Sequence, residues 1–194
     1  MDPCLIVYYS RSGVTATVAR AIAEVCGAEL EALRAVQPIT GVPGYLRAAW
    51  QALSGQPAPI APLRHSADAY PLLLLGTPVW AGHMSSPIRQ YILQQRPYFR
   101  DVALFCTMGG SGGASVMQAM AGLCQREPLA TLCLREQDVR AGRHVDAVRD
   151  FAASLALRRL QRGGADGQAA GQQAPLQTPA SSAPGGSAVS GSAP

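Results

Sequence analysis

Three long runs of apolar residues, each with glycine, serine or threonine at or near its end, constrain this sequence more than any other feature. The runs are CLIVYYS at 4–10, AYPLLLLGTPV at 69–79 and DVALFCTM at 101–108. Continuous apolar runs are typical of strands buried on both faces, as in a parallel sheet covered by helices. Segments with apolar residues at helical spacing lie between the runs. The sequence therefore predicts an α/β fold with a doubly wound parallel sheet.

The complete pattern contains five expected strands and five expected helices. Two weaker strands are expected at 28–36 and 129–136, and helices at 14–26, 41–55, 85–95, 114–125 and 143–161. These elements occupy residues 1–162, a length that suits one domain. Residues 163–194 are mostly Gly, Ala, Pro, Ser and Gln with one charged residue. Because such a segment buries little apolar area, we expect it to be a disordered tail.

Composition excludes several classes of function. The basic residues are 16 arginines with no lysine, which excludes a Walker-type phosphate loop and a Schiff-base lysine. The five cysteines have no C-x-x-C spacing, and with three scattered histidines they predict no disulfide framework and no metal site. The apolar runs are too short to span a membrane, and the start MDPC lacks the basic residues of a signal peptide. We expect a cytoplasmic protein without membrane or nucleic-acid partners.

The segment after the first buried run, SRSGVTAT at 10–17, combines hydroxyl side chains with a glycine at the start of a helix. A helix start exposes unpaired N–H groups and the positive end of the helix dipole. Hydroxyls on Ser10, Ser12, Thr15 and Thr17 add further donors, and Gly13 allows the backbone to approach a ligand closely. This pattern predicts a phosphate cradle that needs no lysine.

The segments after the other two buried runs also indicate a ligand. In GTPVWAGHMSSP at 76–87, Gly76 and Pro78 are expected to end the strand, which leaves Trp80 on a loop to stack on a flat ligand. In CTMGGSGGAS at 106–115, four glycines expose backbone groups to a ligand above the sheet. Ligands of doubly wound sheets bind at the carboxyl ends of the strands, which is where all three segments are expected.

The glycine-rich segment also supports an alternative from another class, a serine hydrolase. Gly109, Ser111 and Gly113 have the G-x-S-x-G spacing of a nucleophile elbow, and Asp138 and His144 follow in the order of a catalytic triad. No HGGG-type segment is present, and this reading leaves the hydroxyls at 10–17 unexplained.

The three segments together resemble the flavodoxin family, over residues 4 to about 160. The phosphate loop of that family, T/S-x-T/S-G-x-T, matches Ser10, Ser12, Gly13 and Thr15, and LLGTPVWAG resembles a flavin-contacting segment. The resemblance implies a five-stranded parallel sheet of order 2-1-3-4-5 with FMN as the cofactor. The residues it implies for the phosphate are Ser10, Arg11, Ser12, Gly13, Val14 and Thr15; for the flavin ring, Pro78, Val79, Trp80, Ala81, Gly82 and His83; and for its pyrimidine edge, Thr107, Met108, Gly109, Gly110, Ser111 and Gly112.

The resemblance implies a protein that transfers electrons through bound flavin, with a redox protein as its partner. The alternative on the same fold is an NAD(P)H-dependent quinone or flavin oxidoreductase, and a binding module that has lost its flavin is a further one. We expect a monomer or a homodimer. The three segments contain no acidic residue, and the net charge is +4, so we expect a less negative second flavin potential than in acidic electron shuttles.

Overall fold

A parallel sheet lies at the centre of the part of the chain that the computed structural model describes, residues 3–36 and 59–171. Its parallel strands are β1 (Cys4–Tyr8), β2 (Glu29–Ala32), β3 (Leu72–Trp80), β5 (Asp101–Met108) and β6 (Thr131–Arg135). Within these residues the strands lie in the order β2-β1-β3-β5-β6. A short strand, β4 (His83–Met84), pairs antiparallel with the end of β3. The predicted doubly wound sheet and its strand order are confirmed.

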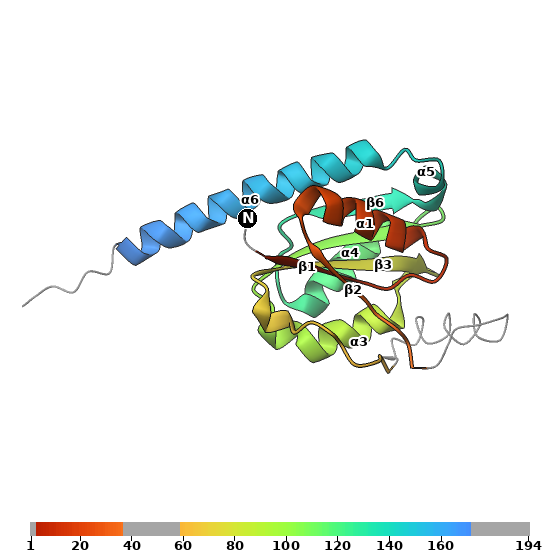
Figure 1. The fold of residues 1–194 in the computed structure, drawn as a ribbon, viewed down its shortest axis with the longest axis horizontal. Helices are drawn as coiled ribbons and strands as arrows, with labels where there is room; N and C mark the ends of the chain where they lie inside the picture. Colours follow the sequence, from red (N-terminus) through yellow and green to blue (C-terminus); the bar gives the residue numbers. More distant parts are fainter. Residues whose placement is uncertain (1–2, 37–58, 172–194) are drawn as a thin grey trace, which may run out of the picture.

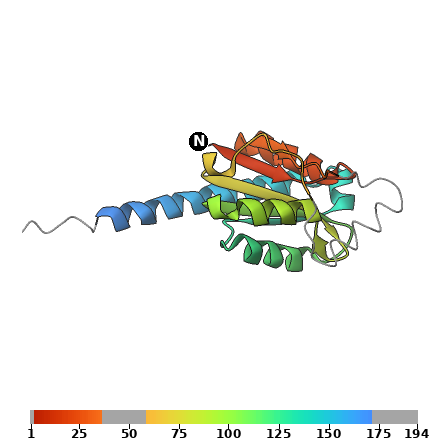
Figure 2. The ribbon, with the colours of Figure 1, turned by 90° about the horizontal axis from the view of Figure 1, so that it is seen from below.

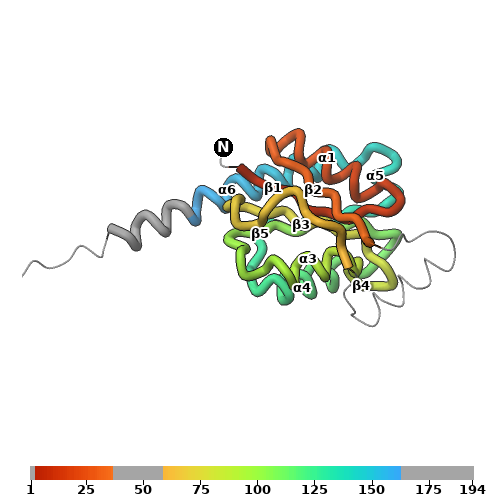
Figure 3. Tube along the Cα trace, turned by 60° about the horizontal axis from the view of Figure 1, so that its bottom comes forward, coloured from red at the N-terminus to blue at the C-terminus, as the bar shows by residue number. Residues whose placement is uncertain are grey.

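Helices cover both faces of this sheet (Figures 1 and 3). One face carries α1 (Val14–Cys26), α5 (Glu136–Arg140) and α6 (Val145–Gly171), and the other carries α3 (Ser86–Gln95) and α4 (Gly113–Cys124). Short 3-10 helices at Ala67–Ala69 and Arg96–Tyr98 precede β3 and β5. The predicted helix at 41–55 lies outside the described residues.

The burial of each strand explains its sequence pattern. Every residue of β1 is buried, because Cys4, Ile6 and Tyr8 pack towards α1 and the alternate residues pack towards α3 and α4. Strand β6 instead alternates exposed and buried residues, because it lies at the edge of the sheet with β5 as its neighbour. The continuous apolar runs therefore form the three central strands, and the weaker patterns form the two edges.

Helix α6 extends past the end of the sheet (Figure 2). An ion pair between Arg162 and Asp101, with an N–O distance of 2.6 Å, joins this helix to the start of β5. The expected domain boundary after residue 162 falls inside α6, whose backbone continues to Gly171. The rest of the expected tail lies outside the described residues, so this boundary stays a prediction. In the two described ranges, no helix has both the length and the apolar character needed to cross a membrane.

Candidate functional site

The turn between β1 and α1 is open at its surface. Arg11, Ser12 and Gly13 are exposed, and nothing lies within 4 Å of the position that a Cβ on Gly13 would occupy. Gly13 is the N-cap of α1, has a φ of 87°, and makes no side-chain capping hydrogen bond. The first amides of α1 therefore have no side-chain cap, as an anion site at a helix start requires.

The hydroxyl groups of this turn divide into two kinds. The Ser10 hydroxyl is buried and has no hydrogen-bond partner among the described residues, and Ser12 is exposed. Thr15 instead shares a hydrogen bond of 2.8 Å between its Oγ1 and that of Thr107, and Thr17 donates to the Gly13 carbonyl at 3.2 Å. Ser10 and Ser12 thus remain as hydroxyls for a ligand, whereas the Thr17 hydroxyl is used inside α1.

The second segment forms a hairpin rather than the expected loop. Strand β3 continues to Trp80, and Pro78 pairs with Thr107 in the ladder with β5. The chain reverses at Ala81 and Gly82, whose φ values of 47° and 79° fit a two-residue hairpin turn into β4. The expectation that Gly76 and Pro78 end the strand is wrong.

Gly76 has a packing role in the centre of the sheet. A Cβ at this position would lie 2.1 Å from the Cζ atom of Phe105, its direct partner on β5. Glycine is therefore needed here because the Phe105 ring fills the space of a side chain.

Trp80 packs against the protein on at least one side. Its ring contacts that of Tyr9 edge to face, with centroids 5.7 Å apart and planes at 88°, and it borders the core between the sheet and α3 and α4. Burial raises the pKa of the Tyr9 hydroxyl, an effect that nearby Arg11 partly opposes. Trp80 is half-buried, so part of its surface stays open.

The third segment, between β5 and α4, is exposed at Gly109, Gly110 and Ser111. Gly112 has a φ of 93°, and a Cβ on it would lie 3.2 Å from the Cα of Gly82. The second and third segments therefore touch through their glycines, and a side chain at Gly112 would push them apart.

Contacts thus join all three segments at the carboxyl ends of β1, β3 and β5. Thr15 joins the first to the third through Thr107, Gly112 joins the third to the second, and Tyr9 joins the first to the second. The Tyr9 amide also donates to the Gly76 carbonyl at 3.1 Å. The structure therefore brings the segments that contain the sequence-predicted residues 10–15, 78–83 and 107–112 next to one another.

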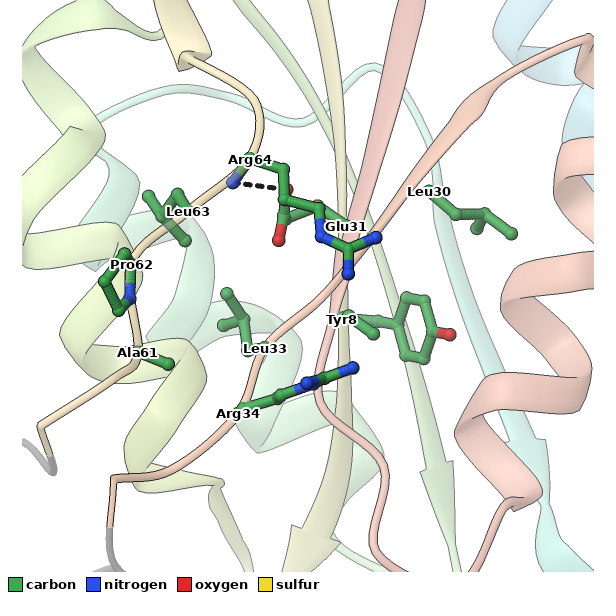
Figure 4. Close-up of a pocket in the computed structure, with 10 residues that line it drawn as sticks. Tyr8, Leu30, Glu31, Leu33, Arg34, Ala61, Pro62, Leu63 and Arg64 are labelled. Carbon is green, nitrogen blue, oxygen red and sulfur yellow. Dashed lines mark hydrogen bonds between the residues drawn. The ribbon is translucent and has the colours of Figure 1, made fainter.

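A cavity of about 200 Å³ lies elsewhere, at the edge strand β2 (Figure 4). Its lining includes Tyr8, and Figure 4 shows the side chains of Arg34 and Arg64 extending towards the Tyr8 ring. Sequence analysis missed this cavity. Arg34 and Arg64 are 30 positions apart, and neither belongs to a recognisable motif.

A buried carboxylate fixes the segment beside this cavity. One oxygen of Glu31 accepts hydrogen bonds from the backbone amides of Arg64 and His65, at 3.0 and 3.1 Å, and lies 2.7 Å from Nδ1 of His65. The other ring nitrogen of His65 lies 3.1 Å from a carboxylate oxygen of Glu29. Each ring nitrogen of His65 thus faces a carboxylate, so the ring links both acidic residues of β2 to the segment before β3.

The geometry does not support the serine hydrolase. Asp138 pairs with Arg143 at 2.6 Å, and the Nδ1 atom of buried His144 has no hydrogen-bond partner among the described residues. A catalytic triad requires a bond from that nitrogen to the aspartate. The G-x-S-x-G spacing at Gly109–Gly113 is therefore part of a glycine-rich loop.

Comparison with protein families identifies the fold. The family model described as Flavodoxin matches residues 3–136, which is more than half of the 194 residues. The chain belongs to the flavodoxin family. A search of curated proteins found no match.

Solved structures have the same fold. A flavoprotein in complex with FMN from Lactobacillus acidophilus is 23% identical, with a TM-score of 0.57 over 73% of this chain and 98% of that one. The two-electron reduced flavodoxin of Megasphaera elsdenii is 18% identical, with a TM-score of 0.51 over 79% and 98%. An NADH:FMN oxidoreductase in its apo form is 9% identical, with a TM-score of 0.51 over 83% and 90%.

Within the flavodoxin fold, the three joined segments lie at the topological switch point. Strand β1 has β2 on one side and β3 on the other, so the chain order reverses there. The site therefore occupies the place where this class of sheet binds ligands.

Proposed function

We propose that this flavodoxin-family protein binds FMN in the site formed by the three segments and transfers electrons through it. FMN is the cofactor of this family, and bound flavin would supply the redox chemistry. The observation that carries the proposal is the set of contacts that joins the three segments at the carboxyl ends of β1, β3 and β5, next to a helix start without a side-chain cap.

The residues present fit the phosphate of FMN. The first amides of α1 have no side-chain cap, Gly13 leaves room for a close approach, and the Ser10 hydroxyl lacks a partner among the described residues. Ser12 and Arg11 lie exposed beside them. These groups would hold the phosphate, with each charge-assisted hydrogen bond contributing about 1.5–3 kcal/mol. Val14 and Thr15 would contribute through their backbone amides.

The residues around the ring would position it without acting as acids or bases. In our proposal, Pro78–His83 lie along one side of the flavin and Thr107–Gly112 along its pyrimidine edge. Trp80 is held by Tyr9 and would present a preset surface to the ring. Since the three segments contain no acidic residue, the charged reduced form of the flavin would be less disfavoured than in acidic shuttles.

The test is a calorimetric titration of the flavin-free protein with FMN and with riboflavin, which lacks the phosphate. We expect FMN to bind at least 100-fold more tightly. Ser12→Asp should weaken FMN binding at least tenfold and leave riboflavin binding unchanged, because like charges repel at the phosphate alone. Ser154→Asp on the exposed face of α6 is the matched control and should change neither.

Two results would overturn parts of this proposal. A protein that releases no heat with either flavin, and has no flavin absorption when purified, would be a binding module that lacks the cofactor. Equal affinities for FMN and riboflavin would contradict the proposed phosphate contacts but would still be compatible with a binding site for the flavin ring.

Direct reduction by NAD(P)H is the second candidate function. The exposed residues Gly109, Gly110 and Ser111 offer no aromatic side chain to cover the ring, and Met108 is the one large side chain in that loop. A nicotinamide or quinone could then stack on the flavin. Anaerobic mixing of the FMN-loaded protein with NADH or NADPH tests this, because rapid bleaching of the flavin indicates an oxidoreductase and a stable spectrum indicates an electron carrier.

A further inference from the structure

Cys106 and Cys133 lie directly opposite each other on neighbouring parallel strands. They are paired in the register of β5 with β6, and their sulfur atoms are 3.5 Å apart, with the Cys106 thiol donating to Cys133. Neighbouring strands are about 4.8 Å apart, which lies within the Cα separations of about 4.4–6.8 Å that disulfides span. Both side chains point to the face covered by α4, so a disulfide between them needs no rearrangement of the sheet.

The two thiols differ in their access to solvent. Cys106 is fully buried, whereas Cys133 is exposed on the edge strand β6. The hydrogen bond from Cys106 lowers the pKa of Cys133 to about 7, and that bond together with burial raises the pKa of Cys106 far above its usual range. Cys133 thus has the properties of an attacking thiolate. Cys106 has those of a resolving thiol that stays protonated until a mixed disulfide has formed on Cys133.

The pair lies directly beneath the glycine-rich loop. A Cβ on Gly113, the first residue of α4, would lie 3.1 Å from the sulfur of Cys133 and 2.9 Å from that of Met108. Gly113 therefore makes room for the Cys133 sulfur at the start of the helix. The other thiols have no such arrangement, since Cys4 donates to the Cys26 carbonyl at 3.9 Å and Cys124 is buried.

We propose that Cys106 and Cys133 form a redox-active dithiol that reduces small disulfide substrates. The Cys133 thiolate attacks one sulfur of the substrate, forms a mixed disulfide and releases the first substrate thiol. Cys106 then attacks the sulfur of Cys133, and its proton passes to the departing substrate thiolate, which closes the protein disulfide and releases the second thiol. Two protein thiols and one disulfide become one protein disulfide and two thiols, so atoms and electrons balance. No step involves flavin, although the pair lies directly beneath the third segment of the proposed cofactor site.

The test treats the reduced full-length protein with oxidised glutathione and follows its intact mass. We expect the wild type to lose two hydrogen masses without an adduct and to stay monomeric on a non-reducing gel. Cys106→Ser, or Cys106→Ala if a buried hydroxyl disturbs folding, should retain one glutathione on Cys133. Cys133→Ser should show neither a disulfide nor a glutathione adduct at Cys106. Cys26→Ser is the control and should behave as wild type.

Three results would overturn the proposal: a wild-type protein that stays reduced, an oxidised wild-type protein whose disulfide joins two chains, and a Cys106 variant without an adduct. Loss of the disulfide in Cys26→Ser would assign the reaction to the other pair of neighbouring cysteines and would equally overturn it.

Discussion

At the scale of single residues, two glycines show how differently the same residue type is used. Gly76 leaves space that the Phe105 ring fills, whereas nothing lies within 4 Å of a Cβ on Gly122 in α4. The first glycine is required by packing, and the second only weakens a helix.

Alanine at these two positions should have opposite effects on stability. Gly76→Ala forces a methyl group into an aromatic ring inside the core and should lower the free energy of unfolding by about 3 kcal/mol. Gly122→Ala should raise it by about 0.5–1 kcal/mol through helix propensity. Urea denaturation of both variants measures this. A Gly76→Ala protein as stable as wild type would contradict the packing of Phe105.

Cys133 should react at a lower pH than an ordinary thiol. The thiolate is the reactive form of a cysteine. Because the pKa of Cys133 is lowered to about 7, the rate of its alkylation by iodoacetamide should be half-maximal near pH 7 and should fall below that pH. Cys106→Ala removes the donor that lowers this pKa and should move the midpoint upward. Peptide mass spectrometry of the alkylated protein follows Cys133 separately, and an unmoved midpoint in that variant would argue against the hydrogen bond.

At the scale of secondary-structure elements, the edge strand β2 is held to the segment before β3 by a charged cluster. Glu31 is 5% exposed and receives three N–H contacts on one oxygen, whereas the Glu29 side chain is 59% exposed and contacts His65 and the Tyr70 hydroxyl. The two carboxylates thus provide a matched comparison on one strand.

We expect Glu31→Ala to cost about 2–3 kcal/mol of stability, because it leaves three partly buried donors without their shared acceptor. Glu29→Ala should cost less than about 1 kcal/mol, since exposed ion pairs contribute little. Thermal unfolding of the two variants tests the difference. Equal losses would mean that the exposed Glu29–His65 contact matters as much as the buried one.

The three buried runs made the central strands, and hence the place of the candidate site, predictable from sequence. Trp80 was predicted on a loop because glycine and proline usually interrupt strands. In the structure Gly76 and Pro78 pair with Phe105 and Thr107 on β5, so β3 continues to Trp80. The cysteine pair and the cavity at β2 were not predictable, because strand register and the approach of residues 61–64 are long-range features without a local pattern.

At the scale of the whole molecule, the candidate cofactor site depends on three strands being assembled together. Its segments lie at the carboxyl ends of β1, β3 and β5 and contact one another, so the unfolded chain has no comparable site. A ligand that binds the folded form alone stabilises it by mass action.

FMN should therefore raise the unfolding temperature. At a free concentration of 100 times its Kd, the gain is about 2.7 kcal/mol, which corresponds to roughly 5–10 °C for a domain of this size. Differential scanning calorimetry measures the shift, with riboflavin at the same concentration as the control. A shift of equal size with riboflavin would show that the phosphate contributes nothing.

The fit of the Phe105 ring against Gly76 also bears on how the chain avoids mispairing as it folds. A slip of one residue between β3 and β5 would set Leu75 or Thr77, each with a side chain, in the place of the glycine. The misaligned sheet could not close around the ring. Gly76 thus favours the native register of β3 with β5 over shifted pairings of the same two apolar strands.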